Sequence, residues 1–160
     1  MLNFKNVLLA SCTLTVRHIV SKKSALQLAS EVLAARFPEL DTRLLFNHLM
    51  EREHLGSTGL GEGVAIPHCR MSGFDQIAGV FLKLRTPIEF ESPDDLPIDL
   101  MFVLVVPNAA EASHLEVLSA LAAVLGKAEH RTLLRDIQTD KALHAEMLQL
   151  LITSHKRRLT

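Results

Sequence analysis

Apolar residues recur at helical spacing in two segments of the first third of the chain, and each segment follows a residue suited to capping a helix. Ser21 precedes the first segment and Asp41 the second, and both side chains can accept a hydrogen bond from a free backbone N–H. The first helix should end before Pro38, because proline disfavours helical backbone in the residue before it. The apolar positions are Ala25, Leu28, Ala29, Val32 and Leu33 in the first helix, and Leu45, Leu49 and Met50 in the second.

Two segments rich in apolar residues, 77–84 and 98–106, predict β-strands. The second is apolar at almost every position, which is typical of a strand covered by helices on both faces of its sheet. Shorter extended segments are expected at 13–16, as an edge strand, and at 64–66. The prolines that mark an irregular connection between the two long strands are Pro87, Pro93 and Pro97.

The C-terminal third begins with a helix whose start has two candidate positions. Ser113 and Glu116 have the spacing of a capping box, which places the helix start at Ser113. Asn108 with Glu111 is a competing start. Gly126 closes the apolar pattern in either case, because glycine readily adopts the left-handed conformation that ends many helices.

The order of these elements predicts one α/β domain. Further helices are expected around 133–137 and from a cap near Thr139. No internal repeat or convincing linker divides the chain, and 160 residues suffice for one core. We therefore expect a single domain over residues 1–160, with a mixed β-sheet flanked by helices on both faces.

Composition excludes several function classes. The formal net charge of −1 argues against a nucleic-acid binder. No apolar stretch reaches the roughly 18 residues that a membrane-spanning helix requires, so no membrane insertion is expected. Cys12 and Cys69 form neither a CxxC pair nor a disulfide framework, which favours a reducing, cytoplasmic location.

Histidine at position 68 is the most prominent candidate for chemistry. It follows Gly61, Gly63 and the stiff dipeptide Ile66–Pro67, and glycines without a Cβ leave room for the close approach of another molecule. Imidazole is a suitable neutral nucleophile near pH 7, because its ordinary pKa is about 6.5. The alternative is a histidine that only packs or faces solvent. A docking patch of Leu60, Val64 and Ile66 is expected beside it.

Four further residues are candidates for holding an anion near His68. If Ser113 caps its helix, His114 occupies the first helical position, where free N–H groups favour phosphate. The guanidinium of Arg52 matches phosphate oxygens with two donors. Ser57 and Thr58 offer hydroxyl donors. Surface pairing, turn formation and packing are the alternatives for these residues.

Nucleotide and metal chemistry fit the pattern less well. The glycines at 59–63 are not followed by Gly-Lys-Ser/Thr, so a phosphate-binding P-loop is not expected. His68, Cys69 and His114 are possible zinc ligands by type, but two of them are adjacent, which is awkward geometry for one ion. We expect no cofactor and no metal.

Two blocks of sequence resemble one family. The segments 52–68 and 114–122, together with Leu104-Val105-Val106-Pro107, are similar to the active-site blocks of IIA components of the bacterial phosphoenolpyruvate-dependent phosphotransferase system, fructose/mannitol type. The resemblance covers nearly the whole chain. It implies the same mixed sheet between helices that the residue pattern predicts. A chain of this length without a IIB or IIC unit looks most like the nitrogen-regulatory branch.

The resemblance implies specific roles. His68 would accept the phosphoryl group, His114 would be its companion, and Arg52 would neutralise charge. The donor would be a small HPr-like phosphocarrier protein, and the targets would be regulatory proteins such as potassium-transport or nitrogen-control components. Two alternatives remain open: a sugar-transport IIA that passes phosphate to a separate IIB, and a non-catalytic protein-binding module. The resemblance implies no role for Cys69.

Overall fold

The elements of the fold alternate between helices and strands. A computed structural model describes residues 2–109 and 111–160. In chain order the elements are α1 (Phe4–Val7), β1 (Leu8–Val16), α2 (Lys22–Arg36), α3 (Thr42–His54), β2 (Gly59–Gly61), β3 (Val64–Ala65), β4 (His68–Met71), β5 (Ala78–Ile88), β6 (Ile98–Pro107), α4 (Glu111–Leu125), α5 (Ala128–Asp136) and α6 (Asp140–Leu159). The α/β class predicted from the sequence is confirmed.

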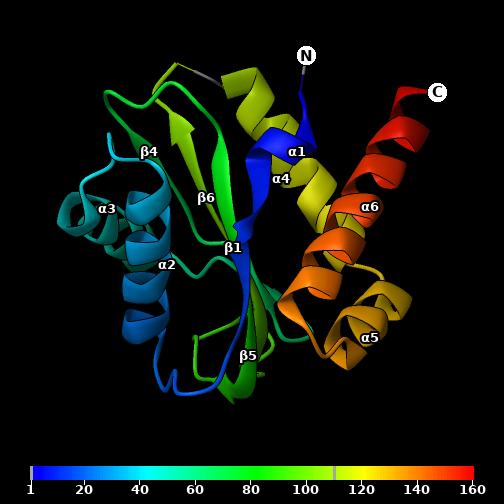
Figure 1. The fold of residues 1–160 in the computed structure, drawn as a ribbon. Helices are drawn as coiled ribbons and strands as arrows, with labels where there is room; N and C mark the ends of the chain where they lie inside the picture. The colour runs from blue at the N-terminus through cyan, green and yellow to red at the C-terminus, as the bar shows by residue number, and fades with distance from the viewer. Residues whose placement is uncertain (1, 110) are drawn as a thin grey trace.

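One mixed sheet forms the centre of the molecule (Figure 1). Its strand order is β1-β5-β6-β3-β2, and β4 also pairs with β6. The β1–β5 pair is parallel and the β5–β6 pair antiparallel. The short strands β3 and β4 both run parallel to β6, against successive parts of it. The edge strand expected near residues 13–16 is confirmed as the end of β1.

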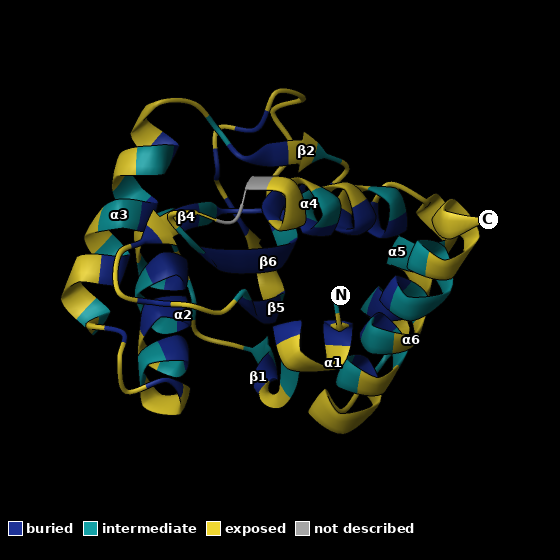
Figure 2. Ribbon diagram, turned by 90° about the horizontal axis from the view of Figure 1, so that it is seen from above, coloured by how far each residue is buried: buried dark blue, intermediate teal, exposed yellow. Residues whose placement is uncertain are grey.

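Helices cover both faces of the sheet, as predicted. Helices α2 and α3 lie on one face, and α1, α4, α5 and α6 lie on the other (Figure 2). Strand β6 contributes side chains to both cores, because successive residues of a strand point to opposite faces. Met101 and Val103 belong to the α2–α3 core, whereas Leu100 and Phe102 belong to the other core.

The predicted helix caps on either side of the sheet are confirmed. Ser21, Asp41 and Thr139 each accept a hydrogen bond from the backbone N–H three residues later, at 3.1, 2.8 and 3.2 Å. Helix α2 ends at Arg36, before Pro38, as expected. Local chemistry therefore determines where these helices begin.

Other boundaries differ from the sequence prediction. Helix α4 already includes Glu111, so the predicted start at Ser113 is wrong and the alternative of Asn108 with Glu111 lies nearer, although residue 110 is outside the described residues. Pro87 lies within β5 rather than in the connection. A shift in the β5–β6 register between Lys83 and Ile88 explains this, because proline lacks the N–H that a regular ladder needs.

Several short elements were not predicted, among them α1, β2 and β4. Each has only three or four residues, which is too short for hydrophobic periodicity to show. None of the helices in the described ranges is long and apolar enough to cross a membrane.

Close packing across β5 and β6 generates a stability prediction. A methyl carbon added at Gly79 would lie 2.3 Å from Cε1 of Phe102, which is fully buried. Gly79→Ala should therefore lower the free energy of unfolding by about 1–3 kcal/mol, the usual cost of overpacking. Thr86→Ala, at an exposed position of the same strand, should stay within about 0.5 kcal/mol of wild type. Urea denaturation measures both, and equal values for the two variants would contradict the packing assignment.

Candidate functional site

Strand pairing holds the backbone of His68 in place. His68 begins β4 and is the register partner of Leu104 in β6. The carbonyl of Pro67 accepts the N–H of Leu104 at 2.8 Å. Pro67 itself has a fixed φ and confines Ile66 to extended backbone. The rigid backbone predicted before His68 is therefore held further by its pairing with β6, which is buried along most of its length.

The glycines before His68 serve contacts within the chain. Gly63 has a φ of +82° and follows Glu62, whose φ is +58°, so a tight turn leads into β3. A Cβ at Gly63 would meet Nη2 of Arg135 at 2.5 Å, and one at Gly59 would meet Oγ of Ser92 at 2.5 Å. The space that the sequence suggested for another molecule is filled, at these two positions, by the protein itself.

The hydrogen bonding of the His68 ring defines its tautomer. Nδ1 lies 2.8 Å from the carbonyl oxygen of Ile66. A carbonyl oxygen can only accept, so Nδ1 carries the hydrogen and donates it. The lone pair of the neutral ring is then on Nε2. Nε2 is therefore the ring nitrogen of His68 that carries the lone pair.

The second predicted histidine lies beside the first. The ring centroids of His68 and His114 are 5.4 Å apart, with the planes inclined at 60°. His114 is only 8% exposed, and its buried Nε2 has no hydrogen-bond partner among the described residues. Because α4 begins upstream of it, His114 does not occupy the first helical position that the sequence suggested. It contributes a buried ring nitrogen instead.

Two adjoining cavities open at His68. One, of about 340 Å³, also includes His114, Arg52 and Arg70 in its lining. The other, of about 260 Å³, is lined by His68 and Arg52 together with Ser57 and Thr58. The other four residues predicted from the sequence therefore line cavities that His68 also lines. The fold brings these side chains together, and their roles stay a prediction.

Arg52 presents a partly free guanidinium to this cluster. Its Nη1 donates to the carbonyl of Gly56 at 2.9 Å, which ties the side chain to the loop after α3. Among the described residues this is its only hydrogen bond. The remaining N–H groups are available to an anion, because guanidinium carries five donors in a planar fork.

Arg70 was not predicted from the sequence. It stands two residues after His68 in β4, and residues two apart in a strand lie on the same face. The alternation was therefore a usable signal, but it required knowing that His68 starts a strand. Nη1 of Arg70 donates to the carbonyl of Asn108 at 2.8 Å, which holds its charge near His114.

The two predicted hydroxyl donors already have partners within the chain. Ser57 Oγ donates to the carbonyl of Phe90 at 3.3 Å. The Thr58 hydroxyl donates to the carboxylate of Glu53, which is buried and also pairs with Lys22 at 3.3 Å. Phosphate binding by either hydroxyl requires it to rotate away from its present acceptor, and this role stays a prediction.

The expected docking patch is smaller than predicted. Val64 and Ile66 are only 1% and 4% exposed because both belong to the core on the α4 side, although Ile66 also lines the smaller cavity. Leu60 remains exposed, as expected. Leu55, which lines the larger cavity, is also exposed, and so is Leu115, the residue after His114 in α4. The apolar surface around His68 is therefore formed by residues from three different elements or their ends.

The surroundings keep both imidazoles neutral. Burial lowers the pKa of His68, and the charge of Arg52 lowers it further, against the opposing effects of the Ile66 hydrogen bond and Glu53. Burial likewise lowers the pKa of His114, with smaller contributions from His68 and Arg70. Both rings are therefore mainly uncharged at neutral pH, as a nucleophile and its neighbour should be.

Cys69 carries a thiol that is poorly suited to act as a nucleophile. Burial raises the pKa of its thiol to about 12, so the reactive thiolate is scarce near neutral pH. Its side chain belongs to the core on the α2–α3 side. Within the described ranges, no three His, Cys, Asp or Glu side chains are grouped so that they could hold a metal ion.

The lowered pKa values predict how the protein responds to acid. Both rings should titrate below 6.5, the ordinary histidine value. As pH falls below that value, the unfolded chain binds protons that the folded chain refuses, so stability decreases until the folded-state pKa values are passed. NMR titration of the imidazole C–H signals measures the pKa values. On acidification, the melting temperature of the double variant His68→Gln, His114→Gln should fall less than that of wild type. Titration of either imidazole at or above pH 6.5 would contradict the burial argument.

Comparison with known proteins finds one consistent group. The family described as "Phosphoenolpyruvate-dependent sugar phosphotransferase system, EIIA 2" matches residues 6–149. A "Nitrogen regulatory protein" of Pseudomonas aeruginosa is 45% identical over 124 residues, which is 78% of this chain and 80% of that protein. Another of that name, from Escherichia coli K12, is 40% identical over 144 residues, covering 89% and 88%.

A solved structure agrees with these sequence matches. The crystal structure of nitrogen regulatory protein IIA-Ntr from Neisseria meningitidis superposes with a TM-score of 0.84 at 37% identity. The match covers 90% of this chain and 98% of that one. The similarity thus extends over the sheet, both helical layers and the two histidine-bearing segments.

Proposed function

The chain belongs to the EIIA type 2 family of the phosphoenolpyruvate-dependent sugar phosphotransferase system, and on that premise we propose that it is a phosphocarrier whose acceptor atom is Nε2 of His68. It takes the phosphoryl group from an HPr-like phosphohistidine protein. The phosphorylation state then controls binding to regulatory targets. This proposal agrees with the fold, with the neutral rings and with the positive charge around them.

One observation carries the proposal: a buried ring nitrogen without a partner beside an oriented nucleophile. Nε2 of His114 is buried and has no hydrogen bond among the described residues, and an unpartnered buried polar atom is costly. Its ring lies 5.4 Å from that of His68. A phosphoryl group on His68 would bring oxygens, with contacts of about 3 Å, within reach of this nitrogen.

The transfer exchanges one N–P bond for another. The lone pair of His68 Nε2 forms the new bond while the donor N–P bond breaks, and the donor imidazole keeps the electron pair. The His68 ring gains positive charge, which the carbonyl of Ile66 stabilises through the hydrogen bond from Nδ1. The phosphohistidine donor is already activated, so the exchange needs neither nucleotide nor metal.

Positioned charge would stabilise the moving group. Phosphoryl transfer passes through a loose transition state with charge on the three peripheral oxygens, so catalysis is mostly positioning and electrostatics. Arg52 and Arg70 line the cavity that contains both histidines. Neither guanidinium loses its charge at any physiological pH, and both therefore complement the phosphoryl dianion.

Partner binding should be brief and depend on the phosphoryl charge. Leu60, Leu55 and Leu115 form exposed apolar contacts around the cavities, which suits a small, transient interface. A phosphate adds roughly one and a half to two negative charges, enough to change the choice of partner. Relatives named nitrogen regulatory proteins support nitrogen-control components as targets, and potassium-transport components stay a prediction.

The free thiols of Cys12 and Cys69 agree with a cytoplasmic location.

The acceptor assignment predicts a clear labelling result. Incubation with the HPr-like carrier, its kinase and labelled phosphoenolpyruvate should label wild type with acid-labile, alkali-stable phosphate. His68→Ala should remain unlabelled because the acceptor atom is gone. His18→Ala removes an exposed histidine outside both cavities and should label fully. Label on the His68→Ala protein would disprove the assignment.

The companion role of His114 predicts a rate effect without unfolding. His114→Gln should slow phosphorylation of His68 about a hundredfold, the usual effect of removing one preorganised donor. Rapid-quench labelling measures the rate, and circular dichroism checks the fold. Loss of folding in both His114→Gln and His114→Ala would indicate a packing role instead.

A transfer assay separates regulation from sugar transport. Phosphorylated protein should not pass its group to IIB components of fructose or mannitol systems at the rate at which it exchanges with its HPr-like donor. Rapid, saturable transfer to a IIB protein would favour the transport alternative. A chain that never becomes phosphorylated would favour the non-catalytic binding module.

A further inference from the structure

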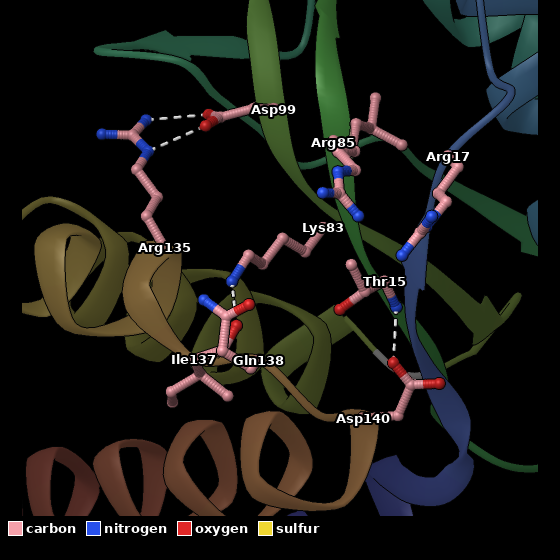
Figure 3. A pocket seen from close by; sticks show the side chains of 10 residues that line it. Thr15, Arg17, Lys83, Arg85, Asp99, Arg135, Ile137, Gln138 and Asp140 are labelled. Atoms are coloured by element: carbon pink, nitrogen blue, oxygen red, sulfur yellow. Dashed lines mark hydrogen bonds and ion pairs between the residues drawn. The ribbon is translucent and has the colours of Figure 1, made fainter.

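A further cavity, of about 560 Å³, lies away from His68, where the end of β1 and residues 83–85 of β5 meet the connection between α5 and α6. Figure 3 shows it from close by, with the side chains of strand residues such as Lys83 and Arg85 and of helix residues such as Arg135 around one space. None of its lining residues lines either cavity at His68. Whatever it binds is therefore independent of the proposed phosphoryl transfer.

Strand register brings two arginines together at this cavity. In the parallel β1–β5 pair, Thr15 is opposite Lys83 and Val16 is opposite Leu84. Arg17 directly follows Val16 and Arg85 directly follows Leu84, so continuing this register places the two arginines side by side. Both line the cavity, and Figure 3 shows their guanidinium groups turned toward the same space.

These two charges are not neutralised within the chain. Among the described residues, neither Arg17 nor Arg85 has a hydrogen bond or an ion pair. Arg135 in the same cavity, by contrast, holds Asp99 with two hydrogen bonds at 2.8 and 2.9 Å. Neighbouring like charges on paired strands destabilise a sheet. A bound anion would remove that repulsion, and paired guanidiniums match the oxygens of a phosphate.

Polar groups continue from the arginines into the cavity. Oγ1 of Thr15 is buried without a partner, although its backbone N–H donates to Asp140 at 2.8 Å. Lys83 donates to the carbonyls of Leu134 and Ile137, and its ammonium group has a third N–H. Asp140 is a carboxylate that can accept from hydroxyl groups. Uncommitted donors and an acceptor therefore face the same space.

We propose that this cavity binds a small phosphate monoester that carries hydroxyl groups. The phosphate would lie between Arg17 and Arg85, and the hydroxyls would meet Thr15 and Asp140. The volume is within the usual range for small-molecule sites. The acceptor carboxylate favours an ester with hydroxyls over inorganic phosphate. The lining contains no aromatic residue, so nothing stacks on a nucleobase and a nucleotide is not favoured.

Titration calorimetry with matched probes tests the site. Glycerol 3-phosphate should bind wild-type protein more tightly than inorganic phosphate, and glycerol should not bind. In NMR spectra the backbone amides of residues 83–85 and 137–138 should shift. Arg17→Gln and Arg85→Gln should each weaken binding of glycerol 3-phosphate about tenfold, the lower end for a charge-assisted hydrogen bond at an exposed position.

Control variants separate this site from other causes. Arg43→Gln removes an exposed arginine of α3 that does not line the cavity and should bind normally. His68→Ala should also bind normally, because its cavities are separate. Without ligand, Arg17→Gln and Arg85→Gln should melt at or slightly above the wild-type temperature, since repulsion is relieved. Unchanged binding in the double variant Arg17→Gln, Arg85→Gln would overturn the site. Equal affinity for inorganic phosphate and glycerol 3-phosphate would overturn the assignment to an ester.

Discussion

The parallel pairing of β4 with β6 is the constraint on which the candidate site depends. Strand β6 is buried along almost its whole length, and its pairing with Pro67 and His68 fixes the backbone at the point where the imidazole projects. Closely packed interiors are hardly compressible, so the backbone that carries His68 is held rigidly. Helix α4 packs on the same strand and brings His114 to a ring distance of 5.4 Å.

The electrostatics of the site follow from this placement. Burial keeps both imidazoles neutral, while Arg52 and Arg70 stay charged at the rim of the same cavity. A neutral imidazole beside permanent positive charge is what the proposed phosphoryl transfer would need. The negative charge of Glu53, which opposes the lowering of the His68 pKa, is offset by its ion pair with Lys22. The cavity away from His68 obtains its charge differently, from Arg17 just after β1 and Arg85 in β5, whose side chains have no partner among the described residues.

Much of the fold and of the site could be predicted from the sequence, but for different reasons. The caps at Ser21, Asp41 and Thr139 rest on contacts within three residues, so local pattern suffices. His68, His114 and Arg52 came from two motifs whose order matched a known family. Arg70 was missed because its relevance depends on β4, a strand of four residues that shows no hydrophobic period. The start of α4 was misplaced because two capping patterns compete there.

The sequence by itself indicated the helices other than α1, the strands β5 and β6, the α/β class and candidate residues for the site. These features follow from side-chain periodicity, capping chemistry and short motifs, all of which act over a few residues. Only the tertiary structure decided that Val64 and Ile66 are core residues, that Nε2 is the free nitrogen of His68, and that Arg17 and Arg85 are neighbours. Those facts depend on strand register and burial, which arise between segments far apart in the chain.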